Sequence, residues 1–221
     1  MTTLVLASAS PARLETLRRA GIEPLVLVSA VDEEAELARA RESAAASGGE
    51  LSPADAVLAL ARAKAESVVA SADLPEGPGR TLVLGCDSML ELGGEIHGKP
   101  ASAELARERW RAMRGGEGWL HTGHWIAEAP GAPSGGGAIG RTASTLVRFA
   151  DVSDAEIDDY VATGEPLRVA GAFTVDGLGG PFISSIEGDF HNVVGLSLPL
   201  LRVLLLDLGV PWRDLRHPGI L

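Results

Sequence analysis

Apolar and polar positions alternate along the chain in blocks that predict strands and helices in turn. Short apolar runs of strand length lie at 3–7, 25–28, 81–84, 88–92, 121–127, 142–149, 169–175 and 182–186. Runs of this length, bounded by turn residues, are typical of buried strands. Gly93-Gly94 separates 88–92 from a short return run at 95–97 and predicts a tight hairpin turn.

Periodic apolar residues and capping signals predict helices between these strands. The expected spans are about 11–20, 53–70, 103–114, 154–163 and 200–208. Ser153 with Glu156 three residues later forms a capping box. The last helix is apolar nearly all round, which predicts that it is fully buried. Strands that alternate with helices and hairpins predict an α/β protein with a mixed sheet flanked by helices.

One domain over residues 1–221 is expected, with two segments outside the regular pattern. Residues 35–51 are rich in Ala, Glu, Arg, Ser and Gly, and residues 130–140 read PGAPSGGGAIG. These compositions predict a charged, partly helical insertion and a flexible connector, both mobile.

The charge balance and the single cysteine exclude several classes of protein. The formal net charge of -11 repels nucleic-acid phosphates, so a general DNA or RNA binder is disfavoured, although a nucleotide in a locally basic cleft is compatible with it. Cys86 alone can form neither an internal disulfide nor a cysteine zinc site. The N-terminal apolar run lacks a basic flank, and 196–208 is too short to span a bilayer, so a cytoplasmic protein with no membrane partner is expected.

The stretch 81–100 carries the first candidate site. Its apolar run stops at Gly85-Cys86-Asp87, which predicts that Asp87 lies at the end of a strand, where α/β proteins commonly hold functional groups. Lys99 follows near the far end of the predicted hairpin. The alternative is an ordinary hairpin with a solvated aspartate and lysine.

Other charged positions allow two interpretations each. Arg13 lies in a first helical turn, where a cation opposes the helix dipole, but Ser8, Ser10 and the free backbone N–H groups there suit a bound anion. An exposed arginine is the alternative. Lys64 lies on or beside the packed face of its helix and either snorkels to solvent or points into a cleft. Glu33 follows a predicted strand and is either solvated or able to hold a hard cation.

Familiar catalytic motifs are missing. The chain has no phosphate-binding P-loop, no complete dinucleotide fingerprint and no nucleophile elbow. His121 and His124 are three residues apart on a predicted strand, which places them on opposite faces and disfavours a histidine metal site.

Eight segments of the chain form a recognisable series, at 8–13, 32–33, 63–65, 85–87, 94–100, 121–123, 160–173 and 188–196. Taken in this order, they resemble the Maf family of nucleotide pyrophosphatases over nearly the whole chain.

The resemblance implies a fold like that of inosine triphosphate pyrophosphatases, with a long mixed sheet, two lobes and a central cleft. It implies hydrolysis of a non-canonical or modified nucleoside triphosphate between the α and β phosphates, a divalent cation such as Mg²⁺ or Mn²⁺, and a homodimer. The family's association with inhibition of septum formation implies a link to cell division.

The resemblance also implies roles for individual residues. Asp87 matches the catalytic acidic residue, and Glu33 with Asp87 matches the metal-binding pair. The phosphate-binding positions are Ser8, Ser10, Arg13, Lys64 and Lys99. The positions that differ between family members with different substrates hold Ala12, Ser88 and Asp176. The pyrimidine-preferring group typically has Arg, Thr and Gln there, and the group that acts on 7-methyl-GTP has a large residue, Gln and Glu. This chain matches neither, although Asp176 is chemically nearer to the second.

Two other functions compete with this interpretation. One is a nucleotide-sensing regulator of septum formation that binds without turnover. The other is a phosphohydrolase that removes the terminal phosphate. The set of charged positions argues against the first, and the products of the reaction would separate the second.

Overall fold

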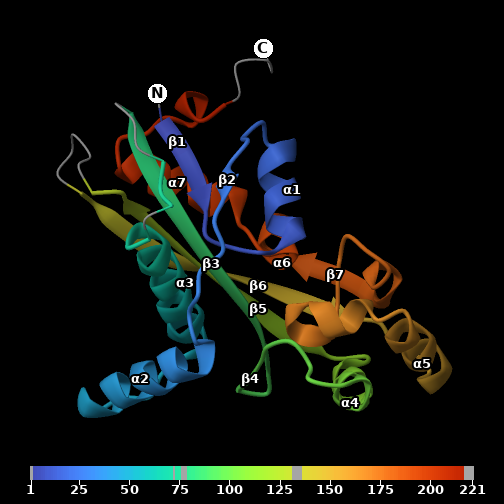
Figure 1. Cartoon of the computed structure of the whole chain (residues 1–221). Coiled ribbons are helices and arrows are strands. Elements are labelled where there is room, and N and C mark those ends of the chain that lie inside the picture. The colour runs from blue at the N-terminus through green and yellow to red at the C-terminus, as the bar shows by residue number, and fades with distance from the viewer. Residues whose placement is uncertain (1, 72, 76–78, 131–135, 217–221) are drawn as a thin grey trace.

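The computed structural model describes residues 2–71, 73–75, 79–130 and 136–216 (Figure 1). Within these residues, seven strands form one sheet in the order β2-β1-β3-β5-β6-β7, with β4 paired to β3. The strands are β1 Thr2–Leu6, β2 Leu25–Val26, β3 Arg80–Leu92, β4 Glu95–His97, β5 Glu117–Glu128, β6 Ala138–Phe149 and β7 Ile183–Glu187. β1 runs parallel to β2 and β3, and the other pairs are antiparallel. The predicted α/β class with a mixed sheet is confirmed.

Helices flank this sheet on both faces. They are α1 Pro11–Arg19, α2 Glu33–Ala46, α3 Pro53–Val69, α4 Ala103–Met113, α5 Asp154–Ala162, α6 Phe190–Val194 and α7 Leu198–Asp207, with 3₁₀ turns at η1 Glu165–Arg168, η2 Ala170–Ala172, η3 Gly180–Phe182 and η4 Trp212–Asp214. Serine side chains cap α1, α3, α4 and α5 at the N-terminus by accepting a backbone N–H three residues on. The capping box of Ser153 and Glu156 is present as predicted. Among the described residues, no helix has the length and apolarity needed to cross a membrane.

Two separate apolar cores lie on one face of the sheet. The first packs α1 and α7 against β1 and one half of β3, and its fully buried residues include Leu17 and Leu84. The second packs α4 and α5 against the other half of β3 and against β5, and it includes Leu90 and Trp110. α3 covers the opposite face of the sheet (Figure 1). The long central strands therefore connect both cores, and the stretch of β3 between them is polar.

β3 runs without a break through the stretch that was predicted to end a strand. The prediction that Asp87 lies at a strand end is therefore wrong, because this residue lies in the middle of a 13-residue strand. A Cβ atom at Gly85 would lie 2.0 Å from the carbonyl oxygen of Ala61 in α3. Glycine at this position allows the helix to approach the sheet closely, rather than ending the strand.

Two other element predictions are wrong. The segment 169–175 is not a strand but forms short turns, because Gly171 and Ala172 adopt left-handed φ angles of 72° and 64°. α7 is not buried on all sides, since Leu206 remains 46% exposed.

The two irregular segments also take definite places. Most of 35–51 belongs to α2, a 14-residue helix with Asp32 as its N-cap, so this segment is more helical than predicted. Of the predicted connector 130–140, residues 131–135 lie outside the described residues, and β6 already begins at Ala138.

Candidate active site

β3 has one open stretch along its edge, in the middle of the sheet. β1 pairs with β3 only as far as Leu84, and β4 pairs with it only from Leu90 onward. β5 pairs with the opposite edge of β3 throughout this region. Residues 85–89 therefore have a described strand on one side only. We call this edge of β3, at residues 85–89, the opening, and Asp87 lies at its centre.

Lys64 contacts the carboxylate of Asp87 directly, and Glu33 contacts the same ammonium group of Lys64. The ammonium group of Lys64, from α3, lies 2.6 Å from Asp87 Oδ1 and 2.7 Å from Glu33 Oε1 at the start of α2. The side chains of Asp87 and Lys64 are only 10% and 11% exposed, whereas that of Glu33 is 53% exposed. Lys64 thus points into the site rather than to solvent, and it joins two carboxylates from distant segments.

The environment of Asp87 makes it a better base than a free aspartate. Burial raises the pKa of Asp87 above its ordinary value, although Lys64 and Arg13 both favour the charged form. A raised pKa brings the carboxylate closer to the range in which a general base is effective near neutral pH.

Arg13 turns inward and ties α1 to the open edge of β3. Its guanidinium donates hydrogen bonds to the carbonyl oxygens of Gly195 and Cys86 at 2.7 and 2.8 Å, and to the hydroxyls of Ser8 and Ser88 at 3.0 and 2.9 Å. These four bonds use most of the five N–H groups of an arginine. The alternative of a solvent-exposed Arg13 is therefore wrong. Its charge lies next to Asp87, but protein acceptors already use most of its donors.

The serines of the first loop support this arginine. Ser8 accepts hydrogen bonds from the backbone N–H of Ser10 and from Arg13, and Ser10 accepts the backbone N–H of Arg13 as the N-cap of α1. Continuing the parallel register of β1 and β3 places Ser8 beside Cys86, at one border of the opening. Ala12 lies half-buried in the first turn of α1.

A band of polar residues lies between the two apolar cores, and of these only Ser88 was singled out as functional from the sequence. The hydroxyl of Ser88 is 2.9 Å from that of Thr122 on β5, and Thr122 donates to the carbonyl oxygen of Asn192 in α6. Thr122 and Asn192 are fully buried. A polar residue on an inward-facing strand position is a signal that could have identified Thr122, because such groups are normally hydrogen-bonded in the interior.

His124 belongs to the same band and makes folding stability depend on pH. Burial lowers its pKa to about 4, and the neutral ring accepts the backbone N–H of Ser197 at 2.8 Å. Between pH 6.5 and 4 the unfolded state therefore binds a proton that the folded state does not, so stability falls as the pH is lowered. Between pH 6.5 and 5 this loss amounts to about 2 kcal/mol. Urea unfolding at both pH values should show it, and His124→Gln should lose about that much of the pH dependence. An identical pH dependence in the variant would contradict the assignment.

Lys99 and Asp176 lie farther from the centre. The ladder between β3 and β4 ends at the pair Leu90 and His97, and Lys99 follows two residues later, next to the other border of the opening. Lys99 is exposed. Asp176 is also exposed, and no hydrogen bond or ion pair among the described residues connects it to Asp87.

The histidines do not form a metal site in the described part of the chain. Both ring nitrogens of His121 are engaged, with Ser144 Oγ at 2.7 Å and Glu91 Oε2 at 2.8 Å. No cluster of three or more His, Cys, Asp or Glu residues suited to a metal ion is found among the described residues. Cys86 is fully buried, and burial raises the pKa of its thiol to about 11.

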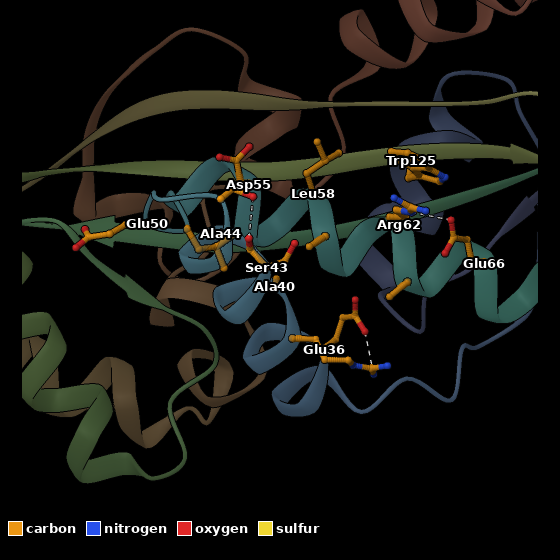
Figure 2. A pocket seen from close by; sticks show the side chains of 15 residues that line it. Glu36, Ala40, Ser43, Ala44, Glu50, Asp55, Leu58, Arg62, Glu66 and Trp125 are labelled. Atoms are coloured by element: carbon orange, nitrogen blue, oxygen red, sulfur yellow. Dashed lines mark hydrogen bonds and ion pairs between the residues drawn. The ribbon is translucent and has the colours of Figure 1, made fainter.

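A groove of about 620 Å³ lies between α2 and α3, the two helices that also carry Glu33 and Lys64. Figure 2 shows Trp125, Arg62 and Glu66 toward one end of it and Glu50 and Asp55 toward the other. Arg62 pairs with Glu66 at 2.7 Å and lies over the Trp125 ring. None of the site residues predicted from the sequence lines this groove.

Comparison with known proteins gives one consistent result. Residues 3–208 match the family model described as Maf-like protein. A protein named nucleoside triphosphate pyrophosphatase from Leifsonia xyli subsp. xyli is 54% identical over 212 residues, which cover 96% of this chain and 95% of the relative. Proteins with the same name from Streptomyces coelicolor and Nocardia farcinica are 54% and 51% identical, and each match covers 98% of this chain and 95% and 98% of the respective relative.

Proposed function

Because the chain belongs to the Maf family, we propose that it is a nucleoside triphosphate pyrophosphatase whose active site is the opening beside Asp87. The reaction cleaves the bond between the α and β phosphates and releases a nucleoside monophosphate and pyrophosphate. The observation that carries this proposal is the meeting of Asp87, Lys64 and Glu33 at the open edge of β3.

Asp87 is the proposed general base. It orients a water molecule for attack on the α phosphorus and accepts the proton that this water loses, because its raised pKa gives it more basicity than a free aspartate. Lys64 keeps the carboxylate ionised and oriented when no substrate is bound.

A divalent cation fits the donors at this point. Asp87 and Glu33 present two hard oxygen donors that already converge on one cation, the Lys64 ammonium. Mg²⁺ is typically held by one or two carboxylates together with substrate phosphates and water, so two protein carboxylates are sufficient. Such an ion supplies charge neutralisation at the phosphates and lowers the pKa of bound water.

Basic residues of the opening bind the polyphosphate. Lys64 and Lys99 contribute two ammonium groups on an otherwise acidic protein. Arg13 adds positive charge, but its hydrogen bonds to Cys86 and Ser88 support a mainly architectural role, in which it holds the open edge in place. Ser8 and Ser10 shape the border on the α1 side.

The base preference is proposed to depend on Ala12, Ser88 and Asp176. Ser88 is held by Arg13 and Thr122 at the opening, which supports a role near the substrate. Asp176 belongs to a turn that the carboxylate of Glu165 holds through the backbone N–H groups of Leu178 and Gly179. A carboxylate at 176 favours a base with an N–H donor, as a purine with an amino group provides.

A panel of canonical and methylated nucleoside triphosphates tests the function. Released pyrophosphate is converted to phosphate by added pyrophosphatase and measured by malachite green, and chromatography identifies the nucleotide product. Monophosphate with pyrophosphate is the expected result. Diphosphate with phosphate would identify a terminal phosphohydrolase instead, and binding without turnover would identify a nucleotide sensor.

Removal of divalent cations is expected to stop turnover. Dialysis against EDTA should lower the rate at least about a hundredfold, because charge neutralisation by a metal ion contributes several kcal/mol to phosphoryl chemistry. Mg²⁺ or Mn²⁺ should restore the rate, and Ca²⁺ serves as the matched control for charge alone. Full turnover in metal-free buffer would contradict the assignment of Glu33 and Asp87 as metal ligands.

We also propose that the protein is cytoplasmic and, as the resemblance to the Maf family implies, that it forms a homodimer. Sedimentation velocity of the purified chain measures the oligomeric state directly, and a monomer at micromolar concentration would contradict this proposal.

A further inference from the structure

The loop that follows β4 presents Lys99 at the border of the opening. The ladder between β3 and β4 ends at the pair Leu90 and His97, and Lys99 lies two residues further on. None of the described residues forms an ion pair or hydrogen bond with the ammonium group of Lys99. The position of the backbone that carries Lys99 therefore limits the region that its ammonium group can reach.

The carbonyl oxygen of Gly98, directly before Lys99, is held from two sides. Arg109 of α4 donates to it from Nη1 at 2.6 Å. The backbone N–H of Gly171 also donates to it, at 3.2 Å. Together these donors fix the peptide group that joins Gly98 to Lys99, because a planar peptide held at its oxygen cannot rotate freely.

The backbone at 171 is shaped to reach this carbonyl. Gly171 adopts φ of 72°, and a Cβ atom there would lie 2.9 Å from Leu90 Cβ. The turn therefore packs directly on β3, the strand that carries Asp87. Ala172 continues the left-handed turn, and its carbonyl oxygen accepts the indole N–H of Trp110 at 2.8 Å. α4 thus contributes both Arg109 and Trp110 to this arrangement.

Arg109 has no carboxylate partner among the described residues. Its side chain is half-buried and its hydrogen bond goes to a carbonyl, whereas Arg107 on the same helix pairs with Asp158 at 2.7 Å. Arg109 therefore uses its half-buried guanidinium to hold the carbonyl oxygen of Gly98, directly before the exposed Lys99. This indicates that the position of that carbonyl matters locally.

We propose that Arg109 is a positioning residue that holds the Gly98–Lys99 peptide so that the Lys99 ammonium reaches the polyphosphate at the open edge of β3. This inference rests on the proposed function, because it assumes that Lys99 binds phosphate groups. Arg109 itself acts through the loop and does not touch the substrate.

A double-mutant cycle tests this proposal. The variants are Arg109→Met, Lys99→Met and the double variant, with Arg107→Met as the matched control on the same helix. The main readout is the Kd for inorganic tripolyphosphate by calorimetry, supported by KM and kcat for a nucleoside triphosphate and by the melting temperature. Each single variant is expected to weaken tripolyphosphate binding about tenfold, as the loss of one charge-assisted contact does. The double variant should be no weaker than Lys99→Met alone, and Arg107→Met should bind as the wild type does.

Each alternative outcome has a definite meaning. Wild-type affinity in Arg109→Met, or two effects that multiply in the double variant, would overturn the positioning role. A lower melting temperature with unchanged Kd and KM would show that Arg109 only stabilises the fold. Absence of tripolyphosphate binding by the wild-type chain, with or without Mg²⁺, would also overturn the inference. Absence of nucleotide turnover with the expected binding cycle would instead reject the proposed function alone.

Discussion

Asp87→Asn is expected to lower pyrophosphate release by at least about a hundredfold, the range typical of a general base. Asparagine keeps the size of the side chain but cannot accept a proton from water. It also leaves the ammonium of Lys64, 11% exposed, with Glu33 as its remaining carboxylate partner. Initial rates with added pyrophosphatase measure the effect. Near-normal turnover would remove Asp87 from its proposed role.

The control for this variant must separate chemistry from folding. Loss of a buried negative charge beside Lys64 also affects stability, so the denaturation midpoint has to be measured for the same preparation. Asp158→Asn is a matched control, since Asp158 also forms an ion pair, with Arg107, but lies on α5 away from the opening. This second variant should retain wild-type rates.

The pH dependence of kcat/KM tests the role of Asp87 independently. A general base must be ionised to work, and burial raises the pKa of Asp87 above its ordinary value of about 3.9. The acid limb of kcat/KM should therefore lie at higher pH than a free aspartate would give. The limb should disappear from the residual activity of Asp87→Asn.

Much of the fold could be predicted because its signals are local. Serine caps and the capping box of Ser153 and Glu156 involve residues three apart, so the sequence displays both partners together. Apolar runs also predicted the central strands, since burial on both faces of a sheet leaves a continuous apolar pattern.

The errors arose where the partner of a residue lies far away in the sequence. Gly85 looked like the end of a strand, but its missing side chain accommodates α3, more than twenty residues earlier in the chain. The turn at Gly171 looked like a strand, because its neighbours are apolar. Its left-handed shape is stabilised by contacts with Gly98 and Leu90, which local composition does not reveal.

The candidate site shows the same limit. A lone arginine in a first helical turn allowed either an exposed side chain or a phosphate ligand, and periodicity could not decide between them. The acceptors of Arg13 are carbonyl and hydroxyl groups at 86, 88 and 195, which only the folded chain brings together. The role of Arg109 was missed for the same reason, since its partner is a backbone carbonyl and backbone groups leave no signature in a sequence.

Gly85→Ala is expected to destabilise the protein by at least about 3 kcal/mol, the upper part of the range for overpacking. The added Cβ would lie 2.0 Å from the carbonyl oxygen of Ala61 and 2.9 Å from the backbone nitrogen of Ala65. Both contacts are with helix backbone, which no rotamer change can relieve. α3 must therefore move away from β3, and the separation of Lys64 from Asp87 should increase with it.

The effect should appear in both stability and turnover. α3 also packs closely on β5 at Gly123, where a Cβ would lie 2.3 Å from the carbonyl oxygen of Val57. Because the helix is in close contact with the sheet at both glycines, a small rotation cannot relieve the clash at position 85. Urea denaturation should show a lower midpoint, and the folded fraction should show a lower kcat, because the base has lost its partner. Gly49→Ala is the matched control, since a Cβ there meets nothing closer than 3.9 Å. An unchanged midpoint in Gly85→Ala would mean that the helix does not lie as close to the sheet as the geometry of the site requires.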